Sequence, residues 1–242
     1  MTGSHKHPFC AAKSVRLSAF TLVEMLVVIG IIAALLAITL PCLREIQIYA
    51  RRIKCAHNLN QIDLGIQVYL NCNNDKYPCA QDPLPPGYWL WMGRGWRKFV
   101  EPYLGGKIDA NNPGVLLCPQ DMIAKQKFEA TSYSYSMSFY HSPQQINKMS
   151  STADLYSNPQ PSIPQKIYCV KRPAGKILIG EWYSNHFDVK EENGWWNWQG
   201  CRNFLFADSS VCFINATDIR PANDNLPDGN LTIDGIKGTD RP

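Results

Sequence analysis

Cysteine is the residue type in this sequence most able to do chemistry, because it can form disulfides or bind metals. The chain of 242 residues has nine cysteines, many for a cytosolic protein of this size. No two form a Cys-x-x-Cys pair, and His57, His141 and His186 stand apart, so the common zinc spacings are missing. Cys42 and Cys55 follow an apolar segment, and an even set of six cysteines lies beyond residue 70. If this part of the chain is exported, these six are expected to form disulfides. Buried free thiols and a metal site are the alternatives. This set is Cys72, Cys79, Cys118, Cys169, Cys201 and Cys212.

No catalytic constellation accompanies the cysteines. The sequence lacks a Gly-x-Ser-x-Gly motif, a phosphate-binding loop and a histidine and carboxylate at suggestive spacing, so we expect no enzyme. The acidic tail suggests calcium, but counting from Asp224 puts Leu226 where an EF-hand loop needs Asp or Asn. We expect Asx turns there and no metal site. The tail's polar residues are Asp218, Asn223, Asp224, Asn225, Asp228, Asn230 and Asp234.

One carboxylate stands where charge is costly. Residues 20–40 carry no charge except Glu24, and a helix rising about 1.5 Å per residue would cover about 30 Å over this length, the thickness of a hydrocarbon core. A carboxylate inside a membrane costs about 2.5 to 3.5 kcal/mol. We therefore predict a transmembrane helix in which Glu24 needs a cation that its sequence neighbours do not supply.

The segment before this helix, residues 1–19, is typical of a removable leader. It contains three basic residues and no acidic one, and it ends in Ser18-Ala19. A general secretory signal would instead place a small-residue cleavage site after the apolar segment, where the sequence has Thr39-Leu40-Pro41. These residues match a general secretory signal poorly.

With these residues the chain resembles the type IV prepilins and the pseudopilins of type II secretion. The resemblance implies that a prepilin peptidase cuts Ala19–Phe20 and methylates Phe20, although the family usually has glycine at the position of Ala19. It also implies that Glu24, as the fifth mature residue, pairs with the amino-terminal amine of a neighbouring subunit. An uncleaved single-pass anchor with a chance glutamate is the alternative.

A second resemblance covers most of the chain. Residues 54–62, 77–78, 117–121, 132–135 and 203–211 look like a group of bacterial pseudopilin-like proteins whose amino terminus resembles the G-type major pseudopilin. Ser209 replaces the group's glycine after Asp208, and Trp198 replaces a histidine found ten residues before that aspartate. We expect Asp208 to cap a turn.

The remaining sequence predicts an α+β fold of pilin-like layout, with an amphipathic stem helix over 41–75 and a head over 76–242. Pro41 should kink or loosen the helix between span and stem. The stem carries one apolar stripe, which should cover an antiparallel sheet with long loops. The stripe is Ile46, Tyr49, Ile53, Ala56, Leu59, Ile62, Ile66 and Tyr69. The predicted strands are 114–118, 132–140, 176–182, 203–207 and 211–214.

All seven tryptophans lie in the predicted head. Exposed rings could stack on sugars or seat a protein partner, with Trp195, Trp196 and Trp198 as the candidates, whereas core filling is the plain alternative.

Charge excludes one class of partner. Without the three basic residues of the leader, the chain has 21 basic and 20 acidic residues, and this balance gives no electrostatic reason to expect nucleic-acid binding.

The family resemblance implies a bacterial inner-membrane protein with a cytoplasmic leader and a periplasmic or other extracytoplasmic head. Its partners would be prepilin peptidase, other pilin-like subunits and an inner-membrane assembly platform. We expect a structural subunit of a pilus-like or pseudopilus filament that supports secretion; an adhesin or cargo-binding module is the alternative.

Overall fold

The computed structural model describes residues 21–79, 96–105, 108, 112, 114–124, 131–151, 161–186, 194 and 196–242. The leader, the Ala19–Phe20 bond and Trp195 lie outside these residues. The chain divides into two compact units, the first ending at Glu45 and the second running from Ile46 to Pro242.

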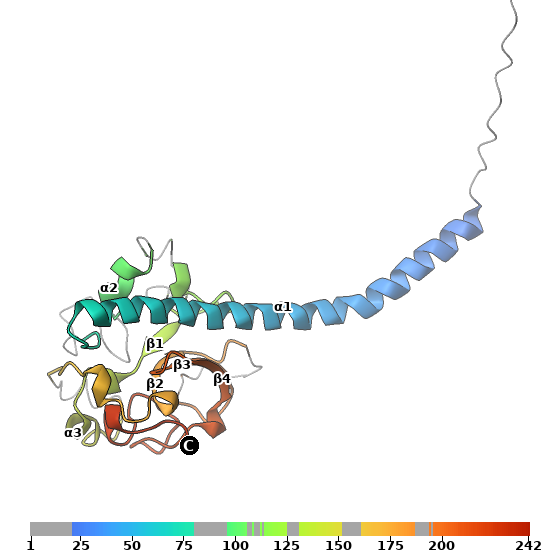
Figure 1. Ribbon diagram of the computed structural model, residues 1–242. Helices are drawn as coiled ribbons and strands as arrows, with labels where there is room; N and C mark the ends of the chain where they lie inside the picture. The colour runs from blue at the N-terminus through green and yellow to red at the C-terminus, as the bar shows by residue number, and fades with distance from the viewer. Residues whose placement is uncertain are drawn as a thin grey trace, which may run out of the picture. The chain divides into compact units, whose positions relative to one another are not determined.

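The dominant element is one helix, α1, which runs without interruption from Leu22 to Cys72 (Figure 1). Pro41 lies inside this helix at the predicted boundary between span and stem, and the helix continues through it. The helix ends three residues before the predicted end of the stem, at a turn where Asn74 and Asp75 adopt left-handed conformations with φ of 55° and 59°.

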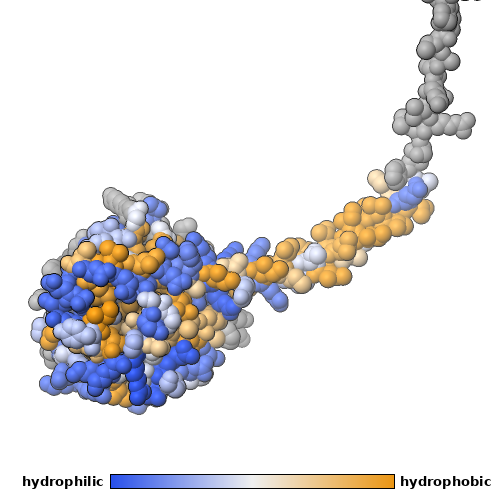
Figure 2. Space-filling model, in the orientation of Figure 1, coloured by the Kyte–Doolittle hydropathy of each residue, from blue (hydrophilic) through white to orange (hydrophobic). Residues whose placement is uncertain are grey.

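The first part of α1 is apolar and exposed, and it is long and apolar enough to cross a membrane (Figure 2). The predicted stripe is confirmed from residue 59 onward, where Leu59, Ile62 and Ile66 are fully buried. It is wrong for Ile46 and Tyr49, which are 61% and 54% exposed, and for Ile53, because the head covers only the last turns of the stem. The buried residues of α1 are Cys55, Asn58, Leu59, Ile62, Asp63, Gly65, Ile66 and Leu70.

The head contains a four-stranded antiparallel sheet in the sequential order β1-β2-β3-β4. The strands are β1 (Tyr133–Tyr135), β2 (Ile177–Glu181), β3 (Cys201–Phe206) and β4 (Val211–Asn215). Together with α1 they confirm an α+β fold. The predicted strand at 114–118 is wrong, because Gly114–Leu116 forms a 3-10 turn that begins at a positive φ. The predicted strand at 132–140 is confirmed only over Tyr133–Tyr135, because Met137–Phe139 forms another 3-10 turn. The short helix α2 (Arg97–Val100) precedes β1, and the short helix α3 (Pro143–Ile146) lies in the connection between β1 and β2.

Both faces of the sheet contribute to apolar clusters. Leu178, Ile179 and Leu205 belong to the cluster that contains the buried stem residues, whereas Phe204 and Phe206 belong to a second cluster. Neighbouring residues of a strand point to opposite faces, so β3 serves both clusters. The stem therefore covers one face, as the sequence predicts.

The turn between β3 and β4 is built as expected. Asp208 Oδ1 accepts hydrogen bonds from the backbone N–H of Ser210 at 3.0 Å and from its hydroxyl at 2.6 Å. Ser209 adopts the left-handed φ of 71° that glycine would adopt at lower cost. Asp208 thus caps the turn and Ser209 is strained by it.

The chain's last segment is tied to the sheet by a buried ion pair. Lys176 Nζ lies 3.0 Å from Asp240 Oδ2, with side chains 0% and 3% exposed. The same carboxylate accepts a hydrogen bond from the backbone N–H of Ile177 at 2.7 Å, and Thr232 contacts both ions. A buried pair with these additional partners anchors the tail beside β2.

Candidate functional site

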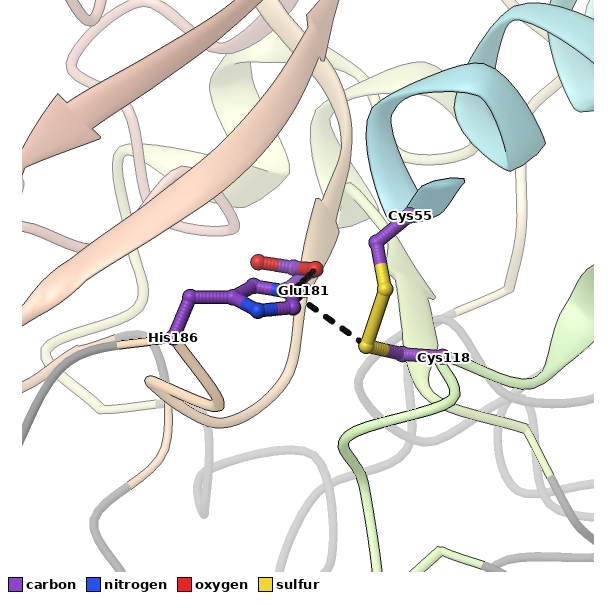
Figure 3. A group of neighbouring side chains, drawn as sticks. All are labelled: Cys55, Cys118, Glu181 and His186. Atoms are coloured by element: carbon purple, nitrogen blue, oxygen red, sulfur yellow. Dashed lines mark hydrogen bonds and ion pairs between the residues drawn. A yellow bond between two sulfur atoms is a disulfide. The ribbon is translucent and has the colours of Figure 1, made fainter. Parts of the chain in front are cut away.

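Four buried residues meet where the stem packs on the head: Cys55, Cys118, Glu181 and His186 (Figure 3). All four side chains are buried, and one ligand atom from each lies within 4.8 Å of the other three. The two cysteines form a disulfide across a sequence separation of 63 residues. The set combines two sulfurs, an imidazole and a carboxylate, so it could perform thiol chemistry or bind a metal.

Each side chain comes from a different element. Cys55 lies on the buried face of α1, and Cys118 follows the 3-10 turn, where its backbone N–H donates to the Ser132 hydroxyl at 2.9 Å. Glu181 is the last residue of β2 and faces Tyr133 of β1 across the ladder. His186 stands in the connection after β2.

The imidazole of His186 joins the two halves of the cluster. Its Nε2 lies 3.0 Å from Glu181 Oε1 and 3.3 Å from Cys118 Sγ, and neither the histidine nor the glutamate side chain is exposed. Nδ1 of this ring is buried and has no hydrogen-bond partner among the residues that the structure describes. The polar contacts of the ring are therefore made by the nitrogen that faces the cysteines.

Asn203 of β3 holds the carboxylate of Glu181 in place. Its backbone N–H donates to Oε2 at 2.9 Å, and its side-chain amide donates to Oε1 at 3.1 Å. These bonds fix the orientation of the carboxylate toward His186. Such outer contacts orient the ligands in metal centres and redox sites alike.

Two further residues support the cysteine side. Tyr133 donates its hydroxyl to the carbonyl of Cys55 at 3.3 Å, and Asn58 donates to the Tyr133 hydroxyl at 3.3 Å and to the Leu117 carbonyl at 3.1 Å. Burial raises the pKa of Tyr133 well above its usual value, and the nearby Glu181 raises it further. Tyr133 therefore stays neutral and acts as a fixed hydrogen-bond donor.

The structure corrects the predicted disulfide set. Cys118 pairs with the stem residue Cys55, which the prediction left out. Cys72, Cys169, Cys201 and Cys212 are free thiols, and Cys79 lies partly buried against the core. An even number of cysteines in the head thus did not identify the pair, because the packing of the stem on the head brings a stem cysteine beside a head loop.

Sequence reasoning also missed Glu181 and His186. His186 counted against a metal because it stands apart from other ligands in sequence, and Glu181 stood out in no motif. The signal that sequence offered was weak: a carboxylate at the end of an apolar strand, with a histidine five positions later. Contacts between distant elements, which no spacing rule describes, assemble the cluster.

Glu24 has a local partner that sequence reasoning overlooked. Its Oε2 accepts hydrogen bonds from the backbone N–H and the hydroxyl of Thr21, both at 2.8 Å, while its own N–H donates to that hydroxyl at 3.2 Å. This is the reciprocal capping box of a helix start. Glu24 thus stabilises the first turn of α1, whatever it does in an assembly.

The candidate tryptophans differ in their surroundings. Trp196 packs edge to face on Trp182 with ring centroids 5.0 Å apart and contacts the second apolar cluster. Trp198 is 37% exposed. Core filling therefore accounts for Trp196, and a ligand contact stays a prediction for Trp198.

In the acidic tail, two aspartates form the expected Asx turns. Asp224 accepts from the backbone N–H of Leu226 at 3.0 Å, and Asp228 accepts from that of Asn230 at 2.9 Å. Burial raises the pKa of Asp224, and it raises the pKa of the fully buried Asp228 to about 7. Their hydrogen bonds thus serve the fold of the tail.

Comparison of the chain with protein-family models, with curated proteins and with solved structures found no match.

Proposed function

We propose that the chain is a membrane-anchored structural subunit that assembles through its amino-terminal helix into a pilus-like or type II secretion pseudopilus filament. The observation that carries the proposal is the first part of α1, where the most apolar window of 18 residues has no buried residue. An apolar helical surface of this length needs lipid or other apolar helices around it. A single-pass anchor that can leave the bilayer for a helical filament core satisfies both needs.

The architecture of the chain supports this proposal. One helix begins as an apolar segment and continues as a stem whose final turns pack on an antiparallel sheet, which is the layout that the family resemblance implies. Prepilin peptidase, pilin-like subunits and an inner-membrane platform are the proposed partners. The head would lie outside the cytoplasm, where a disulfide such as Cys55–Cys118 persists.

Mass spectrometry of the amino terminus tests the proposal most directly. The full-length chain is expressed in a bacterium with a prepilin peptidase and purified from membranes. We expect a mature chain that starts at a methylated Phe20, and we expect an intact Met1 in a strain without the peptidase. A chain that keeps Met1 in both strains, or one cut after Leu40, would contradict the proposal.

A further inference from the structure

We infer that Cys55, Cys118, Glu181 and His186 form a zinc site when the chain is reduced, so that the disulfide and the metal centre are alternative states of one cluster. The inference rests on the geometry of the head and does not depend on filament assembly. Two thiolates, an imidazole and a carboxylate are zinc's usual ligands, and four such groups complete a tetrahedral site.

The distances in the cluster are close to those that zinc requires. With Zn–S bonds of about 2.3 Å and Zn–N and Zn–O bonds of about 2.0 to 2.2 Å, tetrahedral ligand atoms lie about 3.3 to 3.8 Å apart. His186 Nε2 is already 3.0 Å from Glu181 Oε1 and 3.3 Å from Cys118 Sγ, and all four atoms lie within 4.8 Å of one another. The main movement needed is the separation of the two sulfurs once their bond is broken.

The two non-sulfur ligands are held in the direction of the sulfurs. Two hydrogen bonds from Asn203 fix the Glu181 carboxylate, and that carboxylate fixes the Nε2 edge of His186. Because these contacts do not involve the disulfide, they remain when the disulfide is reduced. The reduced thiols would therefore face a preorganised nitrogen and oxygen in a dry site.

Charge also favours a cation at this position. The Glu181 carboxylate is fully buried and its ion-pair partner is His186, a group that is charged only when protonated. Reduction adds two ionisable thiols to the same buried volume, and burial of several negative groups without a cation is costly. Zn²⁺ would neutralise two of the three negative charges of the two thiolates and the carboxylate. The positive charge of Arg202, which interacts electrostatically with Glu181, would help to balance the third.

The exchange between the two states balances with a dithiol as the reductant. The dithiol transfers two electrons to the sulfur–sulfur bond, which breaks, and becomes a cyclic disulfide itself. The two protein thiolates then form two bonds to Zn²⁺, and the two protons of the dithiol pass to water. His186 would bind Zn²⁺ through Nε2 after the proton that Nε2 shares with Glu181 moves to Nδ1, which has no hydrogen-bond partner among the described residues. An oxidant that removes two electrons from the thiolates reverses the exchange and releases Zn²⁺.

The test uses the full chain in detergent micelles. One sample is kept oxidised and another is reduced with dithiothreitol, which is removed without air before Zn²⁺ or Co²⁺ is added. Bound zinc is counted by elemental mass spectrometry after desalting, and cobalt reports thiolate ligands through its charge-transfer and tetrahedral absorption bands. We expect one metal ion per reduced chain, thiolate–cobalt bands, and no metal on the oxidised chain.

Four variants connect the metal to the cluster. We expect Glu181→Gln and His186→Gln to weaken zinc binding by the reduced chain at least tenfold, about the lower limit of the effects seen on loss of supporting contacts. The matched controls are His57→Gln, on the exposed side of α1, and Cys72→Ser, an exposed free thiol. Both should bind zinc like the parent chain.

Several results would overturn the inference. These are a reduced parent chain that binds no zinc, equal binding by the oxidised chain, and control variants that lose as much affinity as the cluster variants. Near-UV circular dichroism checks folding in each sample. A reduced chain that unfolds and does not refold when zinc is added also counts against the inference, because a metal that binds the folded site must favour that fold.

Discussion

Removing the Cys55–Cys118 disulfide should cost the head a large part of its stability. The cross-link spans a sequence separation of 63 residues. In the chain-entropy model a loop of this length restricts the unfolded chain by about 4 kcal/mol at room temperature. Since domains are stable by about 5 to 15 kcal/mol, we expect Cys55→Ala to lower the free energy of unfolding by about that 4 kcal/mol.

Urea unfolding of the detergent-solubilised chain measures this loss, with a chelator present to exclude metal. Tryptophan fluorescence reports on the head, because all seven tryptophans lie there and both Trp96 and Trp182 are buried. Reductant should destabilise the parent chain by the same amount as the substitution and should leave Cys55→Ala unchanged. Cys72→Ser serves as the control and should unfold like the parent chain.

Two outcomes would refute the reasoning. A loss below about 1 kcal/mol would mean that the loop is already restricted in the unfolded chain or that the bond is strained when folded. A reductant that destabilises Cys55→Ala as much as the parent chain would mean that another disulfide carries the effect.

Three further predictions concern single side chains. Asp228, whose pKa is raised to about 7 from a usual value of about 3.9, binds its proton more tightly when folded. The bound proton therefore stabilises the fold below about pH 4, and this stabilisation is lost as the pH rises through 7. Asp228→Asn should reduce the change in the free energy of unfolding between these pH values by up to about 4 kcal/mol, as measured by urea unfolding. Parallel plots of unfolding free energy against pH for the parent chain and the variant would contradict this. Ser209→Gly should stabilise the head by about 1 kcal/mol in the same assay, because glycine relieves the left-handed φ, and a loss would show that the serine side chain matters more. Glu24→Gln and Glu24→Ala should both insert into membranes and both reduce filament formation seen by electron microscopy, while Glu45→Gln assembles normally.

The sequence predicted those parts of the fold that depend on local periodicity. The apolar segment over 20–40, the apolar spacing of the stem and the ranges predicted as strands were enough to place α1 and most of the sheet. Residues 114–118 have strand-like composition but begin at a glycine with positive φ, and Leu116 is buried by the fold around it. Composition alone does not distinguish such a buried turn from a short strand.

The cluster in the head could not be predicted in the same way. Its four ligands come from a helix, a loop, a strand end and the connection that follows, so no spacing connects them. Disulfide arithmetic also failed, because it assumed that head cysteines pair with one another, whereas packing of the stem places Cys55 beside Cys118. Sites of this kind become visible only after the core has brought distant elements together.

The capping box gives Glu24 a second role, and magnitudes separate the two. A helix cap contributes about 0.5 to 2 kcal/mol, and glutamine at the same position makes the same reciprocal bonds without a charge. A carboxylate in the bilayer costs about 2.5 to 3.5 kcal/mol at the centre of a helix and less near the surface. Capping by Thr21 therefore explains the hydrogen bonds of Glu24 but not its charge. In the proposed assembly, the free amine of a neighbouring subunit would compensate this charge. Glu24→Gln tests the charge while it preserves the cap.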